Sequence, residues 1–467
     1  MNTHIKSILS ALAFSILFYS KSFGLNLFLI SILIVSLLMT LKKEHYTSWK
    51  FPTIYLLSAL LVFITPTNYT IFVHAMAFLL FIGKSIAPNS PIYLSWSIGV
   101  MNMIVASAIN YNERTKGTET TKKEISNTTI NYIKGIIAAI LLLFAFSLLY
   151  KNANPVFNEV LTQISFDFIS VPWLFFTFIG YVLFQHILRP YNPKDLIEQD
   201  EKIGNNLEKP KQSFSLKTLK KVKEEHTLGS IIFIALNVLL VFFLTTDVIY
   251  LLQENSSIKV SYSSSVHQGV YALMFSIICA IILILYFFRG NLNFYKKNKQ
   301  LKTLTFLWIG LNVILALFTC IKNYQYVEAL GLTYKRIGVF VYILLTLIGL
   351  ITTYIKVNQL KNFYFLLRTN ITILFSCLFI SALIPWDKAI TEYNLTQIYN
   401  PDITYLIQLG VTNSKQLHTY SSQNKGKIKE KDFERINAKY SSFLKKESER
   451  TWQEYTLYQL TDNNNKQ

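Results

Sequence analysis

The stretch that decides the fold is YQYVEALGLTYKRIGVFVYILLTLIGL, Tyr324 to Leu350, in which a polar half is followed by an almost unbroken apolar run. From Ile337 onward the apolar run is long enough to continue as an α-helix across ~30 Å of hydrocarbon. Thr333 is suited to cap the N-terminus of that helix, which makes Arg336 its third helical residue. A cation at this position is opposed by the helix dipole, so Arg336 needs a stabilising partner.

The whole chain shares this apolar character. Hydrophobic residues fill 52% of its 467 positions, the mean hydropathy is +0.34, and the apolar residues are clustered in runs separated by polar breaks. Runs of membrane-crossing length predict an all-α fold, a polytopic transmembrane helical bundle of about 11–12 spans. The candidate spans are 5–20, 22–41, 51–65, 69–87, 91–110, 131–150, 171–188, 228–252, 265–288, 303–321, 337–355 and 370–385.

The positive charge of the chain indicates its topology. Lys and Arg number 45 against 26 Asp and Glu, and they lie between the apolar segments without a nucleic-acid-binding signature. This pattern favours the lipid bilayer as partner and no nucleic acid, because membrane proteins concentrate Lys and Arg in their cytoplasmic loops. Successive basic connections are separated by two spans, so all can be cytoplasmic: 111–130, 189–226, 289–302 and 356–368.

The same count places the final stretch, 386–467, on the external side. The basic loop 42–50 breaks the parity if all five early segments cross the membrane. Either one segment between 51 and 110 is re-entrant or only half-crossing, or the count is eleven with an internal N-terminus. The N-terminus resembles a signal peptide but lacks a small-x-small cleavage site after its apolar core, which predicts an uncleaved first membrane segment.

Three regions are predicted. Residues 1–130 hold the N-terminal transmembrane segments and a basic loop, 131–385 form the transmembrane core, and 386–467 form a small solvated helical domain outside the membrane. Loop 189–226 is predicted to be a flexible linker. In the last region, apolar residues recur at helical spacing from Phe433 to Phe443, which predicts an amphipathic helix that packs on its neighbours or binds an envelope protein partner.

Few ionisable residues lie near the predicted spans, and each is costly there. Asp247, His267, Glu328 and Arg336 all fall at the external face, with Thr333 beside them. This polar cluster has three possible uses: an ion-paired clasp in which Asp247 or Glu328 neutralises Arg336, a binding site for a phosphate or carboxylate, or an acid/base site. The last would use His267 and Asp247.

No cofactor and no metal are predicted. Cys279, Cys320 and Cys377 all lie inside apolar runs, which does not suit a disulfide framework or a paired-cysteine metal site. The sequence also has no phosphate-binding loop, dinucleotide-binding glycine motif or G-x-S-x-G nucleophile motif. It therefore assigns no catalytic residue.

Several motifs carry a family resemblance: SVHQGVYALMFSI, NPVFNEVLTQISFDFISVPW, YNLTQIYNPDITYL and Tyr326-x4-Gly331-Leu332-Thr333-x2-Arg336. By these the chain resembles bacterial polytopic membrane proteins classed as domain of unknown function 4173, with the related 4153 class. The resemblance covers roughly residues 130 to 410. It implies a bacterial inner-membrane location and brings no established activity.

Three functions are consistent with these features. The first is a non-enzymatic inner-membrane protein that acts in envelope sensing, assembly or partner binding. The alternative is a transporter or lipid-handling protein with an extracytoplasmic polar site, although the chain shows no clear internal repeat and only 16 glycines. A membrane-embedded transferase is the third.

Overall fold

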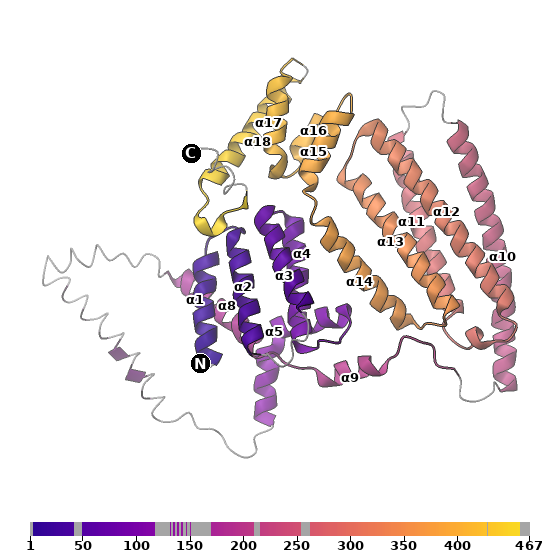
Figure 1. Ribbon diagram of the computed structural model, residues 1–467, viewed down its shortest axis with the longest axis horizontal. Helices are drawn as coiled ribbons and strands as arrows, with labels where there is room; N and C mark the ends of the chain where they lie inside the picture. The colour runs from indigo at the N-terminus through magenta and orange to yellow at the C-terminus, as the bar shows by residue number, and fades with distance from the viewer. Residues whose placement is uncertain are drawn as a thin grey trace.

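The computed structural model is built of helices (Figure 1). It describes residues 3–41, 49–116, 170–209, 215–253, 262–426 and 428–457, with single residues between 131 and 150. Within these ranges there is no β-strand, and an isolated antiparallel bridge joins Asn206 to Lys361. The all-α prediction is confirmed.

The membrane part is made of apolar helices. Six are long and apolar enough to cross a bilayer: α4 (Asn68–Ile86), α8 (Val171–Leu188), α10 (Leu216–Gln253), α12 (Lys299–Leu330), α13 (Tyr334–Asn358) and α14 (Phe363–Ser381). Five further apolar helices have shorter apolar stretches: α1 (Thr3–Phe18), α2 (Leu25–Leu41), α3 (Lys50–Ile64), α5 (Ile92–Lys116) and α11 (Tyr262–Phe287). The predicted span 131–150 falls largely outside the described residues. An α-helix satisfies its backbone polar groups internally and can therefore lie in hydrocarbon. With several helices of sufficient length and apolar composition, the chain is a multi-pass membrane protein.

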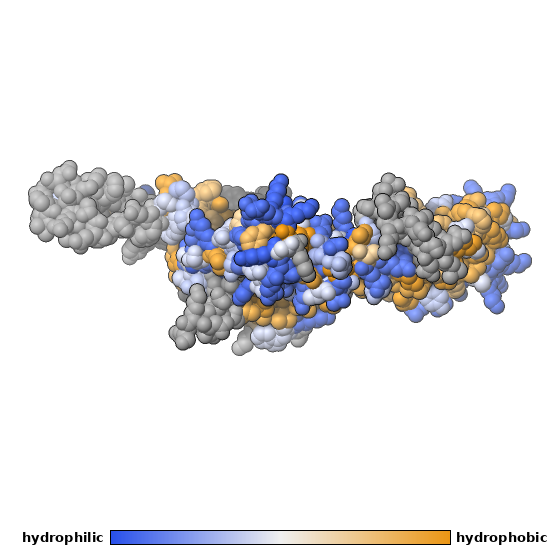
Figure 2. Space-filling view, turned by 90° about the horizontal axis from the view of Figure 1, so that it is seen from above, coloured by the Kyte–Doolittle hydropathy of each residue, from blue (hydrophilic) through white to orange (hydrophobic). Residues whose placement is uncertain are grey.

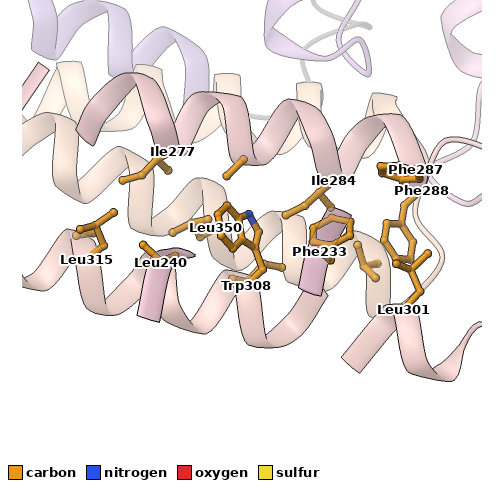
Figure 3. Close-up of a cluster of buried hydrophobic side chains, with 14 of the residues drawn as sticks. Phe233, Leu240, Ile277, Ile284, Phe287, Phe288, Leu301, Trp308, Leu315 and Leu350 are labelled. Carbon is orange, nitrogen blue, oxygen red and sulfur yellow. The ribbon is translucent and has the colours of Figure 1, made fainter. Parts of the chain in front are cut away.

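Helices α10 to α13 form one bundle, which we call the C-bundle, around a continuous apolar core (Figure 3). Phe233 of α10, Ile284 of α11 and Leu350 of α13 are completely buried in it. On its outer side α10 exposes large apolar side chains, with Val238 at 66% and Phe242 at 68%. Apolar side chains exposed in this number suit contact with lipid tails.

Three buried polar residues of α12 are hydrogen-bonded to their own helix. In α12, Thr305, Asn312 and Thr319 are buried at seven-residue spacing. Each donates to the carbonyl four residues earlier, at 2.8, 2.7 and 2.9 Å. Such bonds give each side chain a partner within its own helix, so these small polar side chains can pack inside an apolar bundle.

Helices α1 to α5 and α8 form a second bundle, the N-bundle, on the other side of the molecule (Figure 1). Its helices α4 and α5 approach closely, since a Cβ atom on Gly83 would lie 1.9 Å from the carbonyl oxygen of Ser95. Helix α14 joins the bundles: Phe375 is buried in the N-bundle core, while α14 also contacts α13. The Tyr69 hydroxyl of α4 donates to the carbonyl of Leu378 at 3.0 Å.

Helix α5 does not cross to the opposite end of the molecule. Near its start, the Tyr93 hydroxyl donates to Asp200. In its middle, Asn102 exchanges two hydrogen bonds of 2.7 and 3.1 Å with the backbone of Tyr191, just after the end of α8. The segment that follows α8 therefore binds α5 at both positions, and Figure 1 shows α5 at the same end of the molecule as this segment. This placement is compatible with the prediction of a half-crossing segment between 51 and 110.

With α5 held at one end, the described basic connections lie together. This basic end carries the start of α1, the α13–α14 connection and the 3-10 helix η1 (Asn291–Phe294) after α11 (Figure 1). The α1–α2, α3–α4 and α12–α13 connections lie at the opposite end. Of the predicted basic loops, 42–48 and 117–130 lie outside the described residues.

The prediction of a flexible linker over 189–226 is wrong for most of its length. Residues Lys194–Lys202 form helix α9, and α10 begins at Leu216, well before the predicted start of its span. Asp200 of α9 accepts from Arg368 of α14 at 3.1 Å, and the Leu207 amide donates to Leu360 at 2.8 Å. These contacts with distant parts of the chain order a segment that looks like a linker by composition alone.

The residues after α14 form a small helical cap at the end opposite the basic one (Figure 1). It consists of α15 (Trp386–Gln397), α16 (Ile403–Gln408), η2 (Val411–Asn413), α17 (Ser414–Gln423), α18 (Glu430–Ser448) and η3 (Trp452–Glu454). The predicted amphipathic helix is α18, whose Ile436 is buried against α16 and α17 residues. Seen from this end, hydrophilic side chains gather over the cap (Figure 2).

The last described turn of the cap docks on the N-bundle. Glu454 accepts from both the amide and the hydroxyl of Ser22, each at 2.7 Å, and the Leu25 amide donates to Tyr455 at 2.8 Å. Burial opposes ionisation of Glu454, but the hydrogen bonds from Ser22 and Thr451 outweigh it and lower the pKa of this carboxyl to about 2. The ionised carboxylate therefore holds the docked state.

Glu454→Gln should release this docking. In hydrogen–deuterium exchange at pH 7, we expect the Ser22 and Leu25 amides to lose protection, while Glu449→Gln, on a mostly exposed side chain, leaves them unchanged. Because the folded pKa is depressed, the wild-type contact is complete above about pH 4.5 and lost as the pH falls toward 2. Unchanged protection in Glu454→Gln would contradict the assignment.

Candidate functional site

The candidate site is the junction where the cap meets the turn between α12 and α13. Helix α12 continues to Leu330, so the connection is only Gly331 to Thr333 and much shorter than the predicted external loop 322–336. Gly331 has φ +85°, which a residue with a Cβ adopts only with strain. Thr333 is the N-cap of α13 and accepts from the Arg336 amide at 3.3 Å, as predicted.

Arg336 holds this turn from below. Its side chain folds back so that Nη1 donates to the carbonyl of Leu330 at 2.9 Å and to the carbonyl of Gly331. The guanidinium carbon lies 4.1 Å from the ring centroid of Tyr326. Arg336 is 8% exposed, and its Nε has no hydrogen-bond partner among the described residues. The cation thus stabilises the negative, carbonyl end of α12, which offsets its repulsion by the positive N-terminus of α13.

Asn394 of the cap binds the same turn from above. Its Oδ1 accepts from the Leu332 amide, 2.5 Å away, and its Nδ2 donates to the Leu332 carbonyl at 2.9 Å. A Cβ on Gly331 would lie 2.5 Å from Asn394 Oδ1, so the close approach also requires glycine here. The two motifs Gly-Leu-Thr and Tyr-Asn-Leu-Thr, more than sixty residues apart, therefore meet in one contact.

A second cap contact is made by Asp387. This buried carboxylate accepts from the Tyr334 hydroxyl at 2.7 Å and from Thr412 at 2.9 Å. The Tyr334 amide donates to the Tyr405 hydroxyl at 3.0 Å, and burial raises the pKa of Tyr405, which keeps its hydroxyl protonated. The first turn of α13 is thus bound to the cap through the side chains of Tyr334, Asp387 and Tyr405.

Asp247 does not pair with Arg336. It is 7% exposed at the end of α10 and forms a salt bridge with Lys322 of α12. Among the described residues, Arg336 has no carboxylate partner, so the expected Arg336–Asp247 or Arg336–Glu328 clasp is wrong. The physical reason is that backbone carbonyls at the end of α12 are nearer acceptors, and they offset the charge without burying a second ion.

The predicted cluster is therefore only partly assembled. Thr333 and Arg336 lie together in the turn, and Asn323, next to Lys322, donates to the Arg336 carbonyl at 3.0 Å. Glu328 is exposed on the last turn of α12. His267 lies in α11, and its side chain is outside the described residues, so a pairing with Asp247 is untested.

A family model matches residues 7–420, which is most of the chain, under the description "Domain of unknown function (DUF4153)". The chain belongs to the DUF4153 family. The match includes the Gly331 turn, Arg336 and Asn394, so the whole junction lies inside the family domain. It bears out the resemblance to the 4153 class and not the 4173 label. No curated protein and no solved structure matches the chain.

A pocket of about 600 Å³ opens beside the junction of this DUF4153 domain. Its membrane side is the α3–α4 connection, including Ile64 and Pro66, and its other walls come from α15, η2, α17 and α18 of the cap. Lys388 and Glu392 of α15 place opposite charges on the wall. The volume is typical of ligand pockets, and a mixed lining suits a ligand or peptide with both apolar and charged groups.

Metal chemistry has no visible centre in the described part of this DUF4153 chain. No group of three or more His, Cys, Asp or Glu side chains lies close enough to hold an ion there. The three cysteines are free thiols on α11, α12 and α14. The ionisable residues of the junction bind backbone groups or each other, an arrangement that fixes helices in place.

Proposed function

We propose that this DUF4153 protein acts by binding and not by catalysis, in the inner membrane of a bacterium. The basic end would face the cytoplasm and the cap would face outward. The observation that carries the proposal is the pocket of about 600 Å³ between the cap and the α3–α4 connection. Arg336, Asp387 and Asn394 are engaged in holding the cap over this pocket, which leaves its lining to meet a partner.

The partner class favoured by the lining is a segment of an envelope protein. The wall combines apolar side chains, such as Val411 and Phe443, with charged groups of both signs. A peptide with apolar anchors and charged flanks of both signs fits such a surface, in which Glu447 is paired with Arg450. Binding here suits envelope sensing or assembly.

Site-specific photocrosslinking in cells tests this function. A benzoylphenylalanine at Thr419, which is exposed and lines the pocket, should give a discrete crosslinked protein band. The same group at Ser422, also exposed and one turn away outside the pocket, should not. Adding Val411→Trp to fill the pocket should abolish the Thr419 product; equal products at both positions would overturn the proposal.

The orientation has its own prediction. In a variant without the three native cysteines, Ser422→Cys should react with a membrane-impermeant maleimide in intact spheroplasts. Lys297→Cys, an exposed residue at the basic end, should react only after permeabilisation. This outcome follows from basic loops remaining in the cytoplasm. The reverse labelling pattern would place the cap in the cytoplasm and exclude an extracytoplasmic partner.

A lipid-handling role is the second candidate. The floor of the pocket is the end of α3, where an apolar helix leaves the membrane, so an amphipathic molecule has a short path from the bilayer. In the crosslinking experiment this function predicts a lipid adduct at Thr419 in place of a protein band. Mass spectrometry of the modified chain separates the two.

A further inference from the structure

A second cavity lies at the other end of the molecule, outside the junction and the cap pocket. It is a groove of about 380 Å³ between the N-bundle and α14. Its walls come from the first turns of α3, the last turns of α4, the start of α5 and the side of α14 that meets the N-bundle. These elements are apolar membrane helices, so the groove runs from the basic end into the region of the hydrocarbon.

The walls of the groove consist mainly of apolar side chains, and the hydroxyl groups among them are already hydrogen-bonded. Ile54, Leu80 and Phe379 contribute side chains without polar atoms. The two hydroxyl residues, Thr372 and Ser376, each donate to a carbonyl of their own helix, at 2.7 and 2.9 Å. A ligand in the groove therefore meets hydrocarbon along most of its length, which suits an acyl chain and not a polar substrate.

Two lysines stand at the basic end of this groove. The Lys84 ammonium lies 4.7 Å from the ring centroid of Phe51, and the Lys50 ammonium lies 5.9 Å from the same centroid. Lys84 also donates to the carbonyl oxygens of Pro88 and Ser90, which carry no net negative charge. Two cations thus converge on one ring where the apolar walls begin.

We propose that this groove binds an anionic phospholipid from the leaflet at the basic end, with an acyl chain between α3 and α14 and the phosphate at Lys50 and Lys84. Basic pockets between membrane helices on the cytoplasmic side are suited to anionic headgroups. The positive charges of Lys50 and Lys84 favour an anionic headgroup. The groove walls favour an acyl chain, because the hydroxyls of Thr372 and Ser376 are already hydrogen-bonded within α14. The site is separate from the cap pocket and does not depend on its function.

A phospholipid fits this groove better than a protein helix. The charged end and the apolar walls follow one another along α3, from Lys50 to Ile54, and along α4, from Lys84 to Leu80, in the order of a headgroup and its chain. A transmembrane helix of a partner protein would instead place apolar side chains against both lysines. The groove also lies where the two bundles meet at α14, so a bound chain would fill their seam.

Native mass spectrometry of the purified full chain, titrated with lipids of identical chains, tests the site. Phosphatidylglycerol should bind its first site on the order of tenfold more tightly than phosphatidylcholine. The double variant Lys50→Gln and Lys84→Gln should lose this preference. Lys297→Gln with Lys299→Gln, which removes equal charge from exposed positions at the same end, should keep it.

The chain half of the site is tested separately. Ser376→Phe fills the groove and should weaken phosphatidylglycerol binding about tenfold, whereas Leu374→Phe, exposed on α14 outside the groove, should not. Lys50→Arg with Lys84→Arg retains both charges and should retain the preference, which controls for misfolding. Equal binding of the two lipids to the wild type, or loss of preference in the Lys297/Lys299 variant, would overturn the proposal.

Discussion

Asp247→Ala is expected to lower the free energy of unfolding by about 3 to 5 kcal/mol, a large loss for a single substitution. The side chain of Asp247 is 9% exposed and that of Lys322 is 22% exposed, so removing the carboxylate leaves an ammonium group with little access to water. Lys322→Ala should have an effect of similar size. Unfolding of the purified chain in mixed micelles measures both.

The double variant separates pairing from packing. If the two side chains stabilise each other, Asp247→Ala combined with Lys322→Ala should cost clearly less than the sum of the single changes. The Glu225–Arg289 pair provides a matched control: its atoms are 4.0 Å apart, its arginine is 57% exposed, and its removal should cost about 0 to 1 kcal/mol. Additive losses at Asp247 and Lys322 would show that the pair contributes no coupling.

Arg336→Ala is expected to cost about 2 to 4 kcal/mol. The change removes charge-assisted hydrogen bonds to two carbonyls and the contact with the Tyr326 ring. Arg336→Lys keeps the charge but loses the planar fork, so about half of the loss should remain. The same unfolding experiment measures these values.

Coupling between Arg336 and Asp247 tests the corrected pairing. Because Arg336 binds the turn and Asp247 binds Lys322, Arg336→Ala and Asp247→Ala should be additive within ~0.5 kcal/mol. By contrast, Arg336→Ala and Asn394→Ala act on the same turn and should not be additive. A strong coupling between Arg336 and Asp247 would restore the ion-paired clasp.

The features predicted correctly from sequence are those that depend on local pattern. The apolar runs predict the membrane helices, Thr333 predicts the N-cap of α13, and the spacing from Phe433 to Phe443 predicts α18. Each of these predictions depends only on the residues of a single helix or of its cap. Charge parity leaves two alternatives, a half-crossing segment or eleven spans with an internal N-terminus, and this choice stays a prediction.

The partners of the polar residues could not be predicted in the same way. The polar stretch up to Leu330 predicts an external loop that contains Lys322 and Asn323, but contacts with α10 and α13 order it as a helix. Asn394 lies in the motif YNLTQIYNPDITYL, which carries the family resemblance, but neither that motif nor Asp387 indicates a contact partner. Their roles depend on the tertiary fold, which brings the cap back over the α12–α13 turn.

The docking of Glu454 on Ser22 has a mechanical consequence when combined with the Asn394 contact. The cap is fastened to the C-bundle at Leu332 and to the N-bundle at Ser22, while Asp200 ties α9 to α5 and α14 at the far end. The cap thus connects the two bundles at one end of the molecule, and at the other end Asp200 holds α14, which packs against both bundles. In an alternating-access transport cycle one bundle rocks against the other, and such a cycle would have to break the contacts at one of these ends each time.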